Sequence, residues 1–124
     1  MSVIVTDRGF APDDWQGPVA ELSPEAGSED LGAAAAASMI RIRFDAFGDG
    51  RGFTLARRLR LQGYGGRLRA AGPLLADQYA MARRAGFDEV EIPDEIAARQ
   101  PWEQWQARAD WRAHDYQARL RGTA

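Results

Sequence analysis

The residues best suited to chemistry lie in one glycine-rich segment, residues 45–52, with the sequence DAFGDGRG. Its glycines can take positive φ angles or let a ligand approach the backbone closely. The segment is predicted to open onto a helix, which would place free amide groups and the positive end of the helix dipole beside an arginine. We therefore predict an oxyanion site, for sulfate, phosphate or a similar group, formed by Gly48, Gly50, Arg51 and Gly52.

A purely structural turn is the competing interpretation of this segment. The segment does not match the dinucleotide-binding fingerprint, because the spacing fails where Phe53 follows Gly52. It is not a phosphate-binding P-loop either, since no Lys-Ser or Lys-Thr follows. Three carboxylates could converge with the arginine near the strand ends, namely Asp45, Asp49 and Asp77. Asp49, Asp77 and Gln78 are the candidate supporting residues.

Familiar catalytic and metal-binding sets are missing from the sequence. The chain has no cysteine, which excludes a thiol nucleophile, a disulfide and cysteine ligation of zinc or an iron–sulfur cluster. No two or three metal ligands occur at helical or turn spacing, so no metal site is predicted. The single histidine, His114, fits a packed or surface imidazole better than a base or ligand. Redox chemistry would need a bound cofactor, whose identity the sequence does not give.

The elements that would position these residues form a βαβαβ unit over residues 39–92. Strands are predicted at about 39–44, 67–71 and 88–92, separated by helices of ten to twelve residues. Such alternation indicates right-handed crossovers and an α/β fold with a short parallel sheet. Ligands in such folds bind at the carboxyl ends of the strands, which here are the loops DAFGDGRG and AAGPLLADQ.

The two predicted helices of this unit have clear end signals. The first covers residues 53–62 and ends at Gly63. Its inward face is predicted to hold Leu55, Ala56 and Leu59. The second is predicted to have Pro73 in its first turn and to end at Gly86. On the first strand, Arg41 and Arg43 alternate with apolar residues, so they must face solvent, a partner or the acidic flank.

The flanks complete a single domain over residues 1–124. Residues 1–15 predict an N-terminal strand and turn, pairing as an edge hairpin. Residues 16–38 are rich in Pro, Gly, Ser and Ala and are predicted to be a surface linker with a short helix at 33–37. Residues 93–124 are predicted to form a short helix at 95–99 and a long helix at 102–121.

Trp111 does not fit the apolar stripe of that long helix. At about 100° per residue it lies roughly opposite Trp102, so it would face outward if the stripe packs on the core. Exposed aromatic residues are enriched at the energetic centres of interfaces, which predicts a partner contact or a homodimer. The alternatives are that the N-terminal linker covers Trp111, or that Trp111 is exposed without contacting a partner.

Charge is distributed unevenly along the chain. All 16 basic residues are arginine, and residues 39–86 carry a net charge of +7 between flanks of −6 and −3. This is either a solvated surface or a basic patch for an anionic ligand, because arginine forks match oxyanions in pairs. Acidic flanks argue against nucleic acid. Without a long apolar run or a signal-peptide pattern, we expect no membrane association and a cytoplasmic location.

The run GDGRGFTLARRLRLQGYGGRLRAAGPLLADQYAMARRAGFDEVEI resembles an uncharacterised bacterial family, catalogued as domain of unknown function family 934. VTDRGFAPDDW, AARQ and HDYQARLRG extend the resemblance over nearly the whole chain. The family is described as oxidoreductases involved in sulfite reduction, on the basis of gene neighbourhood and without established catalytic residues. Two departures stand out: Pro73 occupies the position of a histidine in the family pattern, and the linker between Trp15 and Met39 is shorter.

The resemblance implies a role in assimilatory sulfite or sulfate reduction, with sulfite reductase or a related enzyme as partner. Three functions remain open at this point. The first is an accessory or regulatory protein that binds a partner or an oxyanion-bearing ligand at the carboxyl ends of the strands. The second is an oxidoreductase of that pathway that uses a bound cofactor. The third is an interaction module unrelated to sulfur.

Overall fold

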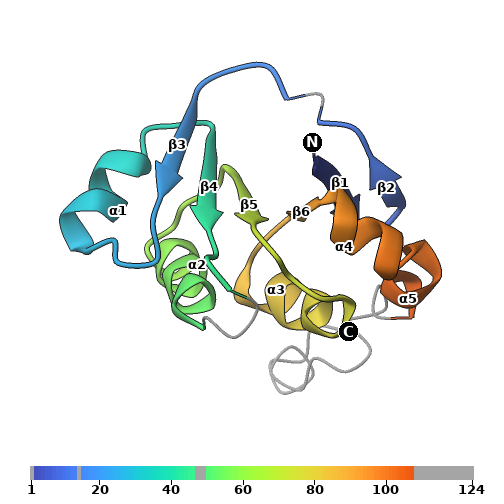
Figure 1. The fold of residues 1–124 in the computed structure, drawn as a ribbon. Coiled ribbons are helices and arrows are strands. Elements are labelled where there is room, and N and C mark those ends of the chain that lie inside the picture. The colour runs from blue at the N-terminus through green and yellow to red at the C-terminus, as the bar shows by residue number, and fades with distance from the viewer. Residues whose placement is uncertain (1, 14, 47–49, 108–124) are drawn as a thin grey trace, which may run out of the picture.

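A computed structural model describes residues 2–13, 15–46 and 50–107 and shows a mixed α/β fold (Figure 1). One six-stranded sheet has the order β2-β1-β6-β5-β4-β3. Its strands are β1 (Ser2–Thr6), β2 (Gly9–Ala11), β3 (Val19–Leu22), β4 (Met39–Arg43), β5 (Arg67–Ala71) and β6 (Glu89–Pro93). The helices are α1 (Ser28–Ala34), α2 (Arg51–Leu61), α3 (Tyr79–Ala85), α4 (Asp94–Arg99) and α5 (Trp102–Gln106).

The predicted parallel sheet is confirmed. Strands β4, β5 and β6 are neighbours and run parallel, with Ile40 level with Leu68 and Ala70 level with Val90. The N-terminal hairpin is also confirmed, because β1 pairs antiparallel with β2. On its other side β1 pairs antiparallel with β6, so the first strand of the chain lies inside the sheet.

Residues 16–38, predicted to be a linker, contain strand β3 and helix α1. This corrects the prediction. β3 lies parallel to β4 at the sheet edge, where flanking prolines are tolerated because one side needs no ladder bonds. Helix α1 covers 28–34 rather than 33–37, because the Asp30 carboxylate accepts a hydrogen bond from the Gly27 amide and buried Leu31 anchors the helix to the core.

Helix α2 begins two residues earlier than predicted, so Arg51 and Gly52 lie in its first turn. Its inward face is as predicted: Leu55, Ala56 and Leu59 are buried. Gly63 ends the helix with a φ of 93°. The Gly63 amide donates to the Arg60 carbonyl and the Tyr64 amide to the Leu59 carbonyl, the paired bonds of a Schellman motif.

The second crossover helix is shorter than predicted. Helix α3 begins at Tyr79, after a 3-10 turn, η1 (Ala76–Gln78), and Pro73 lies in the preceding loop rather than in a first helical turn. The reason is that two side chains, one nearby and one distant in the sequence, bind the amides of the turn before α3. The Leu75 amide donates to Gln78 Oε1 at 2.9 Å, and the Ala76 amide donates to Gln100 Oε1 at 2.6 Å. These bonds hold the loop away from helical geometry, while Gly86 ends α3 as predicted, with a φ of 117°.

The long C-terminal helix is not confirmed. Helix α4 begins at Asp94, and α5 ends at Gln106 in the part of the chain that is described. Trp111 and His114 fall outside that part. Trp105 of α5 is buried in the core, where its indole Nε1 donates to the Gln100 carbonyl at 2.8 Å.

The five helices of the described residues pack on one face of the sheet. One apolar core cluster joins inward residues of α1, α2, α3 and α5 to alternate residues of the strands, among them Ile40, Ile42, Leu68 and Val90. Because β3 to β6 follow one another in both chain and sheet, crossovers of one hand put every connecting helix on the same side. No helix within the described ranges is long and apolar enough to cross a membrane.

Candidate functional site

The second face of the sheet carries a row of charged side chains. Register places Glu21, Arg41, Arg69 and Glu89 side by side on β3, β4, β5 and β6. Arg69 is only 3% exposed and Glu89 only 5%. Burying a charge is unfavourable unless it is paired and hydrogen-bonded, so the contacts of these residues decide whether the face is stable.

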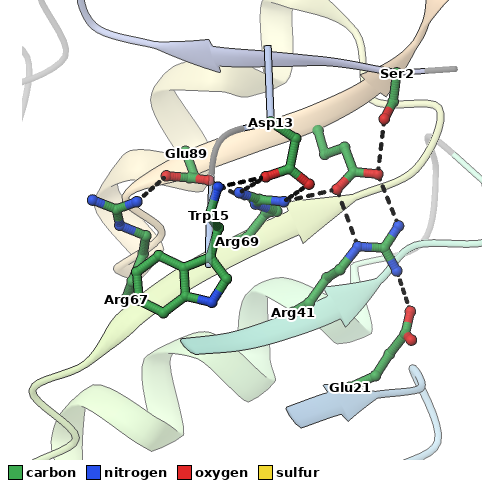
Figure 2. Close-up of polar contacts among 9 residues, drawn as sticks. Ser2, Asp13, Trp15, Glu21, Arg41, Arg67, Arg69 and Glu89 are labelled. Carbon is green, nitrogen blue, oxygen red and sulfur yellow. Dashed lines mark hydrogen bonds and ion pairs between the residues drawn. The ribbon is translucent and has the colours of Figure 1, made fainter. Parts of the chain in front are cut away.

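Arg69 is surrounded by three carboxylates (Figure 2). Its Nε donates to Glu89 Oε2 at 2.6 Å, and its Nη1 lies 3.2 Å from Glu91 Oε1. The end of the guanidinium contacts both oxygens of Asp13, at 3.1 Å from Nη2 and 3.0 Å from Nη1. Burial alone would lower the Arg69 pKa, but hydrogen bonding to Asp13 and the charge of Glu89 outweigh it and raise the pKa.

Arg41 extends the network toward the sheet edge. Its Nε and Nη2 donate to the two oxygens of Glu91 at 3.1 and 2.9 Å, and its Nη1 contacts Glu21. Ser2 Oγ donates to the same Glu91 carboxylate at 3.1 Å. The hydrogen bonds from Arg41 are the main reason that the Glu91 pKa is lowered. Of the three surroundings predicted for Arg41, it is therefore the acidic flank that it contacts.

Asp13 belongs to a segment that crosses this charged face, residues 12, 13 and 15–18, here called the strap. It joins β2 at one edge of the sheet to β3 at the other (Figure 1). Register puts Ala11 level with Arg43 and Val19 level with Met39, a separation of roughly 27 Å on a flat sheet. The eight Cα-to-Cα steps from Ala11 to Val19 reach about 28 Å when extended, so the strap has little slack.

Two side chains attach the strap to β5. The Trp15 ring lies 5.1 Å from the Arg67 guanidinium, in cation–π geometry (Figure 2). The Trp15 amide donates to Asp13 Oδ1 at 3.2 Å, which orients the carboxylate toward Arg69. Hydrogen bonding from Arg69 is the largest cause of a lowered Asp13 pKa. Each partner of the Asp13–Arg69 pair is therefore held by a further contact, Asp13 by the Trp15 amide and Arg69 by Glu89.

A groove of about 1010 Å³ adjoins this network at the amino ends of β5 and β6. Its lining includes five arginines: Arg8, Arg60, Arg67, Arg69 and Arg83. Arg60 is fixed by bonds to the Gly86, Tyr64 and Gly66 carbonyls. Arg8 is exposed, and its guanidinium makes no ion pair with another described residue. The groove lies at the strand ends opposite to those where the sequence predicted a ligand.

The predicted oxyanion loop is described only in part, since Gly48 and Asp49 lie outside the described residues. Gly50 is the N-cap of α2 and, as a glycine, supplies no side-chain cap to that end of the helix. Arg51, in the first turn, has its Nη1 3.4 Å from Glu25 Oε1, and both side chains are exposed. Gly52 has a packing role, because a Cβ there would lie 2.3 Å from the Phe44 ring.

The other predicted supporting residues have local structural contacts. Gln78 caps the turn before α3 through the Leu75 amide, and Asp77 is exposed in the same turn. Asp45 accepts from Arg43 Nε at 2.9 Å, two residues earlier. Among the described residues, no group of three His, Asp or Glu could hold a metal ion.

Sequence reasoning missed the network around Arg69. The alternating runs RLR on β5 and EVE on β6 were a usable signal, because period two places Arg67, Arg69, Glu89 and Glu91 on one face. Asp13 carried no comparable signal. Its position follows only from where β2 and β3 lie in the sheet.

Stability is expected to decrease in acid because of two carboxyls. The pKa values of Asp13 and Glu91 are lowered in the folded protein, so the unfolded chain binds protons more readily there. Their contribution is complete above the unfolded pKa, about 4, and is lost as pH falls through the folded values. Urea unfolding across this range should show the loss. Glu91→Gln should flatten it, and an unchanged slope would contradict the assignment.

Comparison with protein families matches residues 20–124 to the family described as "Bacterial protein of unknown function (DUF934)". No curated protein and no solved structure matches the chain. Arg51, Arg69 and Glu89 lie within the matched range, whereas Asp13 and Trp15 of the strap precede it.

Proposed function

Because the chain belongs to this family of bacterial proteins of unknown function, we propose a role from its chemistry: an accessory or regulatory protein that binds an oxyanion-bearing ligand. In this proposal it acts in the cytoplasm, in assimilatory sulfite or sulfate reduction, as the sequence resemblance implies. A sulfur oxyanion or its ester would be the ligand, and sulfite reductase or a related enzyme the partner.

The observation that carries the proposal is the start of α2. The N-cap of this 11-residue helix is Gly50, which has no side chain to cap the first amides, the helix follows β4 in the chain, and Arg51 lies in its first turn. Free amides and the helix dipole favour an anion there, and a guanidinium can add paired hydrogen bonds. Glu25 is one group with which a ligand would compete for Arg51.

Removing the Arg51 side chain is expected to weaken sulfate binding by about tenfold or more, since a charge-assisted hydrogen bond contributes roughly 1.5 to 3 kcal/mol. Arg51→Ala would be compared with the parent by calorimetric titration of sodium sulfate at constant ionic strength. Glu25→Gln should tighten binding, because it removes the competing carboxylate.

Arg57→Ala is the matched control, because Arg57 is exposed on the same helix beyond its first turn. If Arg51→Ala and Arg57→Ala bind sulfate alike, the site is not at the start of α2.

The partner part of the proposal has its own test, co-purification with sulfite reductase. Trp111→Ala should weaken that complex, or a homodimer, if Trp111 lies in the interface. A bound chromophore in protein purified from its own cells would instead favour the oxidoreductase alternative.

A further inference from the structure

We propose that the end of the Arg69 guanidinium is a second oxyanion site, that Asp13 of the strap occupies it as a built-in ligand, and that a sulfate-, phosphate- or carboxylate-bearing molecule in the groove displaces Asp13. This inference rests on the proposed function in one respect, that the ligand carries an oxyanion. The position, the arginine and the competing carboxylate are all different from those at the start of α2.

The first support is the geometry of the pair. Arg69 presents two terminal nitrogens to the two oxygens of Asp13, at 3.1 and 3.0 Å. This two-pronged arrangement is the one by which arginine binds any planar or tetrahedral oxyanion. Glu89 contacts the guanidinium through Nε, from the neighbouring strand, and so keeps the side chain in place when its terminal nitrogens change partner.

The second support is the difference in burial between the two partners. The Arg69 side chain is 4% exposed, whereas that of Asp13 is 47% exposed. The arginine is therefore held rigidly within the protein, and the carboxylate that covers it is open to solvent. A purely structural buried ion pair would be expected to shield both partners, because screening by water weakens an exposed pair.

The third support is access from the groove. The lining of the groove includes both Arg69 and Pro12, the strap residue next to Asp13. Five arginines line it together with Asp7, Asp88 and Glu89, a formal excess of two positive charges. Such an excess in a concave surface raises the local concentration of anions. Arg8 and Arg67 are exposed enough to contact the remainder of a ligand.

The strap itself need not leave the sheet. Because the strap has little slack between β2 and β3, exchange would take place by rotation of the Asp13 side chain, with the backbone remaining in place. The incoming oxyanion must then compete with a carboxylate tethered beside the site, whose effective concentration is of millimolar order. The parent protein should therefore bind simple oxyanions weakly at this site. Removal of the Asp13 carboxylate should increase the affinity of the site for them.

The test is Asp13→Asn, which keeps the shape of the side chain and removes its charge. Sodium sulfate, sodium phosphate and sodium acetate would be titrated separately at constant ionic strength, with the amide and indole N–H signals of Trp15 followed by NMR. We expect Asp13→Asn to bind at least one of these anions about tenfold more tightly than the parent, as removal of a charged competitor implies. The order of the three affinities distinguishes a sulfur or phosphorus oxyanion from a carboxylate.

Asp45→Asn is the matched control, because it removes one exposed carboxylate paired with Arg43 and so changes the net charge equally. An equal gain in Asp45→Asn, or no gain in a folded Asp13→Asn protein, would overturn the inference. Trp15→Ala is a second variant that keeps both charges but removes the stacking on Arg67. Trp15→Ala should also bind the anion more tightly than the parent, by a smaller factor than Asp13→Asn. This variant replaces Asp13→Asn in the test if Asp13→Asn does not fold. An anion affinity no higher than that of the parent would again contradict the Arg69 site.

The outcomes also separate this site from the one at the start of α2. Anion binding that depends on Arg51 but does not respond to Asp13→Asn would leave the proposed function intact and refute the Arg69 site. A gain in Asp13→Asn that persists in Asp13→Asn/Arg51→Ala would establish the Arg69 site independently. Absence of binding to the parent and to every variant would refute both.

Discussion

Replacing Arg69 with methionine is expected to lower the free energy of unfolding by about 3 to 5 kcal/mol, the usual effect of removing one partner from a buried ion pair. The loss would leave Glu89, whose side chain is 7% exposed, without its 2.6 Å contact, and would bring Glu91 and Asp13 into mutual repulsion. Urea unfolding followed by circular dichroism measures this change in the free energy of unfolding.

A second substitution should recover much of that loss. In Arg69→Met/Glu89→Leu the buried carboxylate is gone as well, and an apolar pair of similar volume is often as stable as the ion pair it replaces. Arg43→Met is the control on the same face, because its pair with Asp45 is about half exposed on both sides. That variant should lose less than about 1 kcal/mol. An Arg69→Met protein as stable as Arg43→Met would show that the network contributes nothing to folding.

Gly72→Ala is expected to lower the free energy of unfolding by about 3 kcal/mol or more, since it combines backbone strain with a steric clash. Gly72 has a φ of 148°, and a Cβ there would lie 2.2 Å from the Phe44 carbonyl oxygen. The backbone cannot easily move away. The Gly72 amide donates to the Glu91 carbonyl at 3.0 Å, and the Phe44 amide donates to the Ala71 carbonyl at 2.7 Å.

Two other glycines separate the strain from the clash. Gly65 has open space around its Cβ position and no positive φ, so Gly65→Ala should change stability by less than about 0.5 kcal/mol. Gly63 also has open space but a φ of 93°, so Gly63→Ala should lose about 1 kcal/mol from strain alone. Equal losses at Gly63 and Gly72 would mean that the contact with Phe44 is relieved at little cost.

The central strands could be predicted because their signals are local. Ile40 and Ile42 alternate with arginines, and glycines bound the helices between strands. The alternation and the glycine positions together predicted β4, β5 and β6 to within a residue or two at each end. The end of α2 at Gly63 and that of α3 at Gly86 followed from the same local chemistry. Such signals do not depend on the rest of the fold.

What could not be predicted depends on long-range pairing. Strand β3 has only four residues between two prolines, and it is a strand because it pairs with β4 across the alanine-rich helix. The start of α3 is set by Gln100, which follows it by more than twenty residues. The contact of Asp13 with Arg69 requires that β2 and β3 occupy opposite edges of one sheet. No local pattern in the sequence contains that information.

The position of β1 has a consequence for synthesis of the protein. Of the six strands, β1 is made before the others, yet its inner neighbour is β6, with Ser2 level with Pro93. At about 5 to 20 residues per second, the intervening chain takes roughly 5 to 18 s to make. During that time β4 can pair with β3, and β5 with β4, while the apolar residues of β1 still lack β6. We therefore expect the N-terminal hairpin, although made early, to join the sheet only once β6 has been made, and the contact of Asp13 with Arg69 to form with it.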